Sequence, residues 1–189
     1  GSFANTDTIE GGVNGAVFDL GSMSGDFTNS GSITGTSGNG VDISVYDWGT
    51  SEAPAAILNS ESGVIEGGVA GFKLVAGTVH GSFTNQGSIT GGTNGATFNV
   101  TTFDAPFANS GVINGGANGV VMALGSASGG FENSGGITGT SGNGVDILVT
   151  NWGSSEVPAD FVNTATGTIG GGDDGLVVNL VTFHGDVTN

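Results

Sequence analysis

The chain has 189 residues, of which 40 are Gly and none is Cys, and 17 acidic residues against one basic residue, Lys73, give a formal net charge of −16. A chain with a single cation cannot neutralise a nucleic-acid backbone or an anionic lipid surface, so this composition excludes nucleic-acid partners and electrostatic membrane binding. No stretch approaches the ~20 apolar residues of a membrane-spanning helix, so we expect no membrane insertion.

Asparagine marks an internal repeat along the whole chain. It recurs at intervals of 24 to 30 residues, and the pattern of intervals returns after 104 residues. The recurring residues are Asn5, Asn29, Asn59, Asn85, Asn109, Asn133, Asn163 and Asn189. We therefore divide the chain into a first super-repeat of four units, residues 1–104, and an incomplete second one, residues 105–189. The second is expected to continue the first as one solenoid.

Each unit has the same three elements in the same order. It opens with an apolar residue two positions before the Asn, in most units a Phe, such as Phe27. An isolated Ile such as Ile33 follows, and a Gly-rich corner then leads into alternating apolar and polar residues, as in residues 41–45. A period of two predicts a strand with one buried and one exposed face, and no window shows the 3.6-residue period of a helix.

Stacking of these units predicts the architecture. Short strands do not hold a sheet alone, whereas stacked units place like residues above one another. We predict an all-β fold, a parallel β-helix (β-solenoid) with three sides, a right-handed winding and coils of 24–30 residues. The Asn residues are expected to form a hydrogen-bonded ladder at a coil corner. An internal aromatic column is predicted to contain Phe27, Phe83, Phe107 and Phe131.

The longest insertion, residues 46–54, is copied at residues 150–158. Trp48 and Glu52 of the first loop recur as Trp152 and Glu156 of the second. Two interpretations stay open. The aromatic and acidic side chains form a loop that binds a carbohydrate or protein partner, or the Trp covers one side of the core, as base rates for recurrent aromatic residues favour.

A calcium motif is suggested by residues 37–45, SGNGVDISV, which are similar to the calcium-binding nonapeptide GGxGxDxUx. The apolar residues flank the Asp instead of following it by two, and the period is 24–30 residues instead of nine. Asp42 and Asp146 are the two residues that fit. We therefore expect no built-in calcium roll and no other cofactor, while loose calcium binding by surface carboxylates stays open.

No set of residues suggests catalysis. His80 and His184 are equivalent residues four coils apart, about 19 Å by strand spacing, so they cannot share a metal ion. We expect both His side chains to be solvated. The Asp173–Asp174 pair is similar to the carboxylates of β-helical pectin-degrading glycosidases, but those enzymes also need basic residues, and this chain has only Lys73. We predict no catalytic residues and no enzymatic activity.

Units of the type FTNSGSITGTSGNGVDI, residues 27–43, resemble the repeats in passenger regions of bacterial autotransporters and of large filamentous surface adhesins. The Phe-x-Asn, Ile-x-Gly and Gly-apolar-x-apolar elements that carry this resemblance extend over the entire chain. The resemblance implies secretion, an extracellular or bacterial cell-surface location and a β-helical rod. It implies no particular activity, because such motifs are structural.

These observations predict a structural or adhesive component of a bacterial surface or extracellular filament. The alternatives are a carbohydrate-binding or carbohydrate-active β-helix module and a calcium-dependent surface-layer module. Residues 1–5 are similar to residues 81–85, so we expect a longer tandem array or end-to-end self-association, and a surface carbohydrate or protein receptor as a further partner. The net charge is expected to oppose association side by side.

Overall fold

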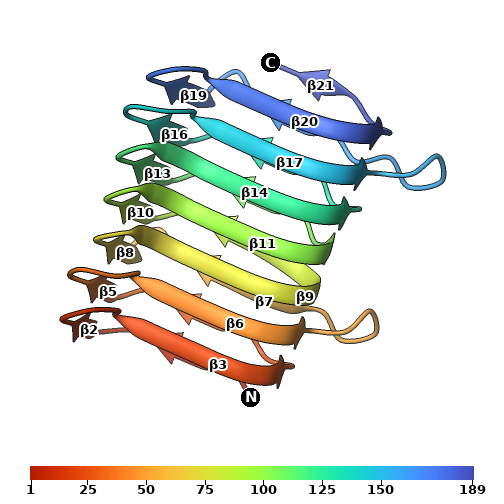
Figure 1. The fold of residues 1–189 in the computed structure, drawn as a ribbon. Coiled ribbons are helices and arrows are strands. Elements are labelled where there is room, and N and C mark those ends of the chain that lie inside the picture. The colour runs from red at the N-terminus through yellow and green to blue at the C-terminus, as the bar shows by residue number, and fades with distance from the viewer.

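The computed structural model describes residues 1–189, which form 21 strands and no helix. The strands lie in three parallel ladders, and the chain passes through each ladder once per coil (Figure 1). Accordingly, no helix long and apolar enough to cross a bilayer is present. The predicted all-β parallel solenoid is confirmed, and the right-handed winding stays a prediction.

We call the three ladders A, B and C. Ladder A contains β1 (Phe3–Asn5), β4 (Phe27–Asn29), β7 (Ala55–Asn59), β12 (Phe107–Asn109), β15 (Phe131–Asn133), β18 (Phe161–Asn163) and β21 (Val187–Thr188). Ladder B contains β2 (Thr8–Gly11), β5 (Ser32–Gly35), β8 (Val64–Gly67), β10 (Ser88–Gly91), β13 (Val112–Gly115), β16 (Gly136–Gly139) and β19 (Thr168–Gly171). Ladder C contains β3 (Ala16–Met23), β6 (Val41–Trp48), β9 (Ala70–Asn85), β11 (Asn94–Asp104), β14 (Asn118–Ala127), β17 (Val145–Trp152) and β20 (Leu176–Phe183).

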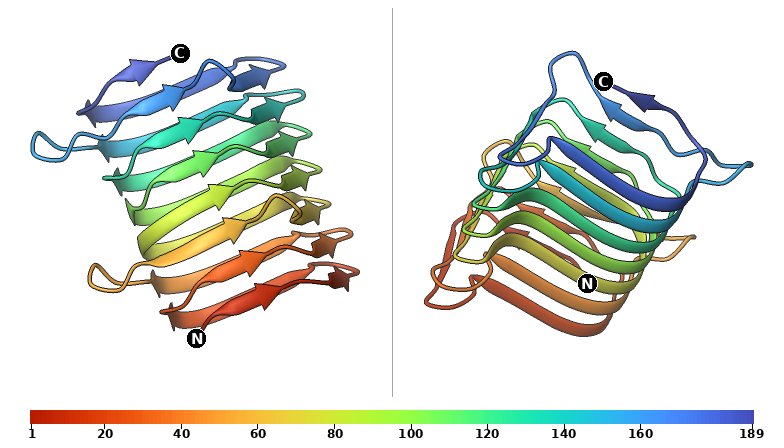
Figure 2. Two further views of the ribbon diagram at one scale, coloured as in Figure 1. Left: turned by 180° about the vertical axis from the view of Figure 1, so that it is seen from behind. Right: turned by 45° about the horizontal axis from the view of Figure 1, so that its top comes forward.

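Strand β9 joins two of the ladders. Its first half pairs with β6 and β11 in ladder C, and its second half pairs with β7 and β12 in ladder A. Ladders A and C therefore count as one 14-stranded sheet, and ladder B is a separate 7-stranded sheet. The three ladders enclose a continuous interior, as the views in Figure 2 show.

The interior is one hydrophobic core that runs through both super-repeats. A single cluster of 35 buried residues extends from Met23 to Phe161. In ladder A the ring of Phe107 lies stacked between Phe83, 5.0 Å away, and Phe131, 4.5 Å away. Phe27 is in the same register but is separated from Phe83 by Ile57. The predicted aromatic column is therefore confirmed, with one aliphatic residue within it.

The Asn residues form the expected ladder along the inner side of one corner. Each Nδ2 donates a hydrogen bond of 2.8 Å to Oδ1 of the equivalent Asn on the following coil, from Asn5 through to Asn189. Buried polar groups need partners, and these amides also donate to backbone carbonyls. Asn109 Nδ2, for example, donates to the carbonyl oxygens of Gly111 and Gly136. The ladder therefore fixes the register of coil on coil.

Gly is required where the corners of successive coils meet. A Cβ atom on Gly119 would lie 2.5 Å from the carbonyl oxygen of Gly144 and 2.6 Å from Cγ2 of Ile137. No side chain fits in this space, so each ladder C strand has a Gly at its start or just before it. The tight corners leave the outer face of ladder C as a broad surface along the rod.

Candidate functional site

The two inserted loops project from the same side of the rod, where ladder C ends (Figure 1). Residues 49–54 connect β6 to β7, and residues 153–160 connect β17 to β18. Each loop begins with a Gly in the left-handed region, Gly49 at φ 69° and Gly153 at φ 70°. A Cβ atom there would be strained and would also meet a backbone oxygen, so Gly lets the chain leave the coil at this point.

Both Trp side chains belong to the core. Trp48 is 0% exposed and Trp152 is 3% exposed. Their indole Nε1 atoms donate hydrogen bonds to the carbonyl oxygens of Ala55 (3.0 Å) and Ala159 (2.9 Å), which close the loops from inside. Of the two interpretations of the loop, the structure therefore assigns core packing to the Trp residues, and a partner cannot touch side chains that are buried in this way.

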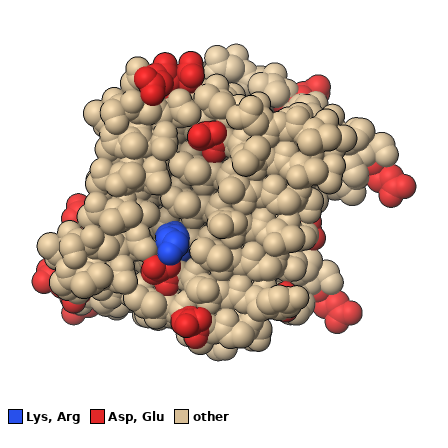
Figure 3. Space-filling model, viewed as in Figure 1, with Lys and Arg blue, Asp and Glu red and all other residues tan.

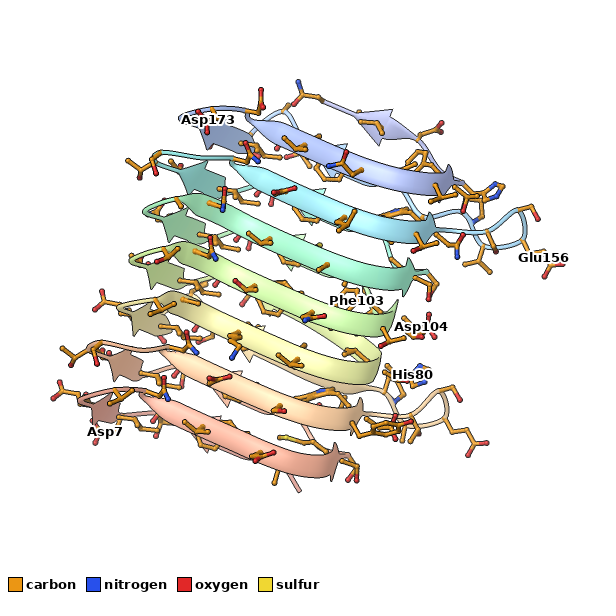
Figure 4. The ribbon with its side chains drawn as sticks, in the orientation of Figure 1. Asp7, His80, Phe103, Asp104, Glu156 and Asp173 are labelled. Carbon is orange, nitrogen blue, oxygen red and sulfur yellow. The ribbon has the colours of Figure 1, made fainter.

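The acidic residues of the loops are the accessible ones. Glu52 and Glu156 are exposed at the loop tips, and Figure 4 shows Glu156 pointing into solvent. Each tip is held by a tight turn, in which Thr50 Oγ1 accepts from the amide of Ala53 at 3.0 Å and its copy repeats this with Ser154. With four coils between them, the two tips lie about 19 Å apart along the rod. They present two copies of one contact at a fixed spacing.

Asp42 and Asp146 occupy equivalent positions on the outer face of ladder C. Asp42 accepts a hydrogen bond from Asn39 Nδ2 at 2.8 Å and forms an ion pair with Lys73, whose Nζ lies 3.2 Å from Oδ1. Asp146 accepts only a long hydrogen bond from Asn143, at 3.4 Å, because Val177 stands where the Lys would be. Four strand spacings separate the two carboxylates, so they cannot bind one ion together.

Metal-ligating residues are not clustered elsewhere. No group of three or more His, Cys, Asp or Glu side chains is placed to hold a metal ion. Asp173 and Asp174 lie in the corner between β19 and β20, and both are exposed. Figure 4 shows Asp173 at this corner, on the opposite side of the molecule from the two loops.

One polar row was missed in the sequence. His80 was expected to be solvated, but its Nδ1 lies 3.6 Å from Oδ2 of Asp104 on the next coil (Figure 4). On the coil after that, Ser128 donates to Oδ1 of Asp104 at 2.7 Å. In a Ser-His-Asp triad the Ser hydroxyl contacts the His, whereas this hydroxyl donates to the carboxylate. The row therefore links three coils and has a different order of contacts from a catalytic triad. Its signal in the sequence was the 24-residue spacing of the three residues.

A groove lies on the outer face of ladder C and has a volume of about 620 Å³. Its lining contains Asn99, Thr101, Ala123, Gly125, Leu148, Thr150 and Asn179, and no charged residue. It therefore offers hydrogen-bonding and apolar contacts but no acid or base.

The chain matches no protein-family model, no curated protein and no solved structure. The geometry of the coils, the loops and the outer faces therefore carries the functional inference.

Proposed function

We propose that this chain is a structural and adhesive segment of a bacterial cell-surface or extracellular filament built from tandem copies of the 104-residue super-repeat, without catalytic activity. The observation that carries the proposal is the seam between the two super-repeats. At this seam Phe83 stacks on Phe107 with ring centroids 5.0 Å apart, and Asn85 donates to Asn109 at 2.8 Å. Within the second super-repeat, Phe107 and Phe131 are 4.5 Å apart, and Asn109 donates to Asn133 at the same 2.8 Å.

The contact between the two super-repeats resembles the contact between neighbouring coils within one super-repeat. Further copies can therefore be added without a junction of a different kind. Stability in such a solenoid is a sum over neighbouring coils, so each added copy extends the rod and its core. One copy of four coils adds about 19 Å of length. Such a rod suits a filament that holds contacts away from a surface.

The adhesive part of the proposal rests on the loops. Glu52 and Glu156 are exposed, recur once per super-repeat and project from one side of the rod. A filament of many copies would present them in a row, and weak contacts in a row gain strength by multivalency. A protein or carbohydrate receptor on another surface is the partner we propose for these loops.

We also propose end-to-end association as a route to longer rods. Two ends that met would repeat the contact between coils inside the chain, in which Val145, Ile147 and Val149 of β17 are at most 2% exposed.

The test is a series of arrays with two, three and four copies of residues 1–104. We expect the rod length in electron micrographs to grow by about 19 Å per copy and the melting temperature to rise with copy number. Copies that appear as separate beads, or that melt at a temperature independent of copy number, would refute the tandem rod. Antibodies against the Glu52 loop should label intact source cells or their filaments, and labelling only after lysis would refute the surface location.

The two alternatives make different demands. A carbohydrate-active module needs a pair of carboxylates about 5–10 Å apart in a groove, and the groove on the outer face of ladder C has none. A calcium-dependent surface-layer module needs oxygen ligands gathered at one place, whereas Asp42 and Asp146 lie far apart. Both observations support the non-catalytic filament.

A further inference from the structure

The outer face of ladder C carries unusually large exposed apolar side chains. Tyr46 is 74% exposed, Leu148 is 60% exposed and Val181 is 76% exposed, and all three point outward from the ladder. The three side chains lie on β6, β17 and β20, so apolar contacts are available at several places along this face. We call this surface, made by the outward residues of β6, β9, β11, β14, β17 and β20, the C face.

The C face carries charges of both signs. Its residues that are not buried include the only cation of the chain, Lys73, and four acidic residues, Asp42, Asp47, Asp104 and Asp146. Figure 3 shows this face, with the Lys in blue and acidic atoms in red next to it. A second copy can therefore place charges of opposite sign against each other across the contact, where the register brings them together.

Register along the ladder makes the C face self-complementary. Consider a two-fold axis that lies in the plane of contact, parallel to the strands, between β11 and β14. Rotation about it keeps each position along a strand and reverses the order of coils, so that β9 faces β17 of a second copy and β6 faces β20. Two rods related in this way run antiparallel and form an isologous contact.

The residues that this rotation brings together match in character. Because Lys73 and Asp146 hold the same position along their strands, the only cation of the chain faces Asp146 of the partner subunit. By the same register, Val75 faces Leu148 of the partner subunit. Tyr46 faces Val181 of the partner subunit, at the end of the groove that Thr150 and Val181 line.

We infer that the C face is a docking surface for a second, antiparallel copy of this chain. Six coils and about six residues per strand span roughly 24 by 20 Å, which corresponds to about 1,000 Å² of total buried area, near the lower limit of specific interfaces. The dimer is therefore weak, and it strengthens with salt, which screens the repulsion between two acidic rods. The inference does not depend on the tandem filament, because the C face runs along the side of the rod and not across its ends.

Disulfide trapping tests the register directly, because the chain has no Cys. The double variant V75C/L148C should form covalent dimers on oxidation, since inter-sheet disulfides can join packed sheets. Within one chain the two positions are three coils apart, about 14 Å, which is beyond the reach of a disulfide. The single variants V75C and L148C should stay monomeric, because neither position faces its own copy. Equal cross-linking of single and double variants, or none in any, would overturn the antiparallel register.

Sedimentation equilibrium in high salt tests the surface itself. L148D should weaken self-association by about tenfold or more, because it places a carboxylate against an apolar residue. The matched control V112D adds the same charge on ladder B, where Val112 is also exposed, and should leave the association unchanged. D146K should weaken the dimer by placing Lys opposite Lys73. Equal effects of L148D and V112D, or no effect of D146K, would refute the proposal.

Discussion

Replacing Asn109 with Asp tests the donor side of the Asn ladder, because it exchanges the side-chain NH2 group for an oxygen. Asn109 Nδ2 donates to Oδ1 of Asn133 at 2.8 Å and to the carbonyl oxygens of Gly111 and Gly136 at 3.3 Å each. An ionised carboxylate would place an oxygen against these three acceptors in a buried position. Only the donor from Asn85, at 2.8 Å, would remain. The introduced acid is therefore expected to stay protonated in the folded chain.

The size of the effect follows from the protonation equilibrium. Burial without donors raises the pKa of a carboxyl by about 3 to 5, from about 3.9 in the unfolded chain. Because the folded variant holds the proton more tightly, its stability is greatest below the unfolded pKa and falls as the pH rises towards the folded pKa. Each pH unit between the unfolded and folded pKa costs about 1.4 kcal/mol, and about two to three of these units lie between pH 5 and pH 8, so we expect N109D to lose about 3–4 kcal/mol relative to wild type over this range.

Urea unfolding followed by circular dichroism, in steps from about pH 5 to about pH 8, measures this loss. The sequence pI of about 4.1 makes lower pH unsuitable, because the net charge vanishes there. N99D is the matched control, since Asn99 is exposed and the same change should show no such slope. N109A should lose stability by an amount that does not vary with pH. A flat difference between N109D and wild type would refute the donor assignment in the ladder.

Three further predictions concern the core, the loops and metal ions. F107A should lower the free energy of unfolding by about 3–5 kcal/mol, with the outward change A108S as control, and a loss no larger than that of the control would contradict the stacked column. W152F removes the hydrogen bond to Ala159 and should cost about 1–2 kcal/mol, whereas E156A should leave the melting temperature unchanged; the opposite order would mean that the loop tip carries stability. A chelator should not change the melting temperature, and a drop that added calcium reverses would favour the surface-layer alternative.

Much of the fold could be predicted because inward-facing residues repeat. Phe107 is aligned with Phe131 and Asn109 with Asn133, so the period gives the stacking, and the stacking gives the core. A residue that is enclosed on every coil must be similar from coil to coil, and that similarity is visible in one sequence. Ile57, the aliphatic residue within the aromatic column, could be identified in the sequence for the same reason, because it also precedes a repeated Asn by two positions.

The outward side chains could not be predicted in this way, because they need not be alike. Asp104 meets His80 and Ser128 on adjacent coils, three residue types with no resemblance that a repeat search would register. The ion pair of Lys73 with Asp42 depends on a 31-residue step that contains the first loop. Likewise, the Trp residues could be assigned to the core or to a partner until the paths of the loops were known. The residue types identified candidate residues, and only the three-dimensional register of the coils showed which of these residues contact one another.

The amides of the Asn ladder all point the same way, and this gives the molecule a direction that its outline does not have. From Asn5 to Asn133, two carbonyl acceptors hold each NH2 group on one side, as Gly111 and Gly136 do for Asn109. A single amide therefore cannot turn over without placing oxygen against oxygen. An inverted amide would also leave one neighbour facing a second donor and the other facing a second acceptor. Orientation is therefore shared by the whole column, like the alignment of dipoles in a polar crystal. Coils can be added to such a column in one sense only, since two columns that met at like ends would oppose donor to donor or acceptor to acceptor.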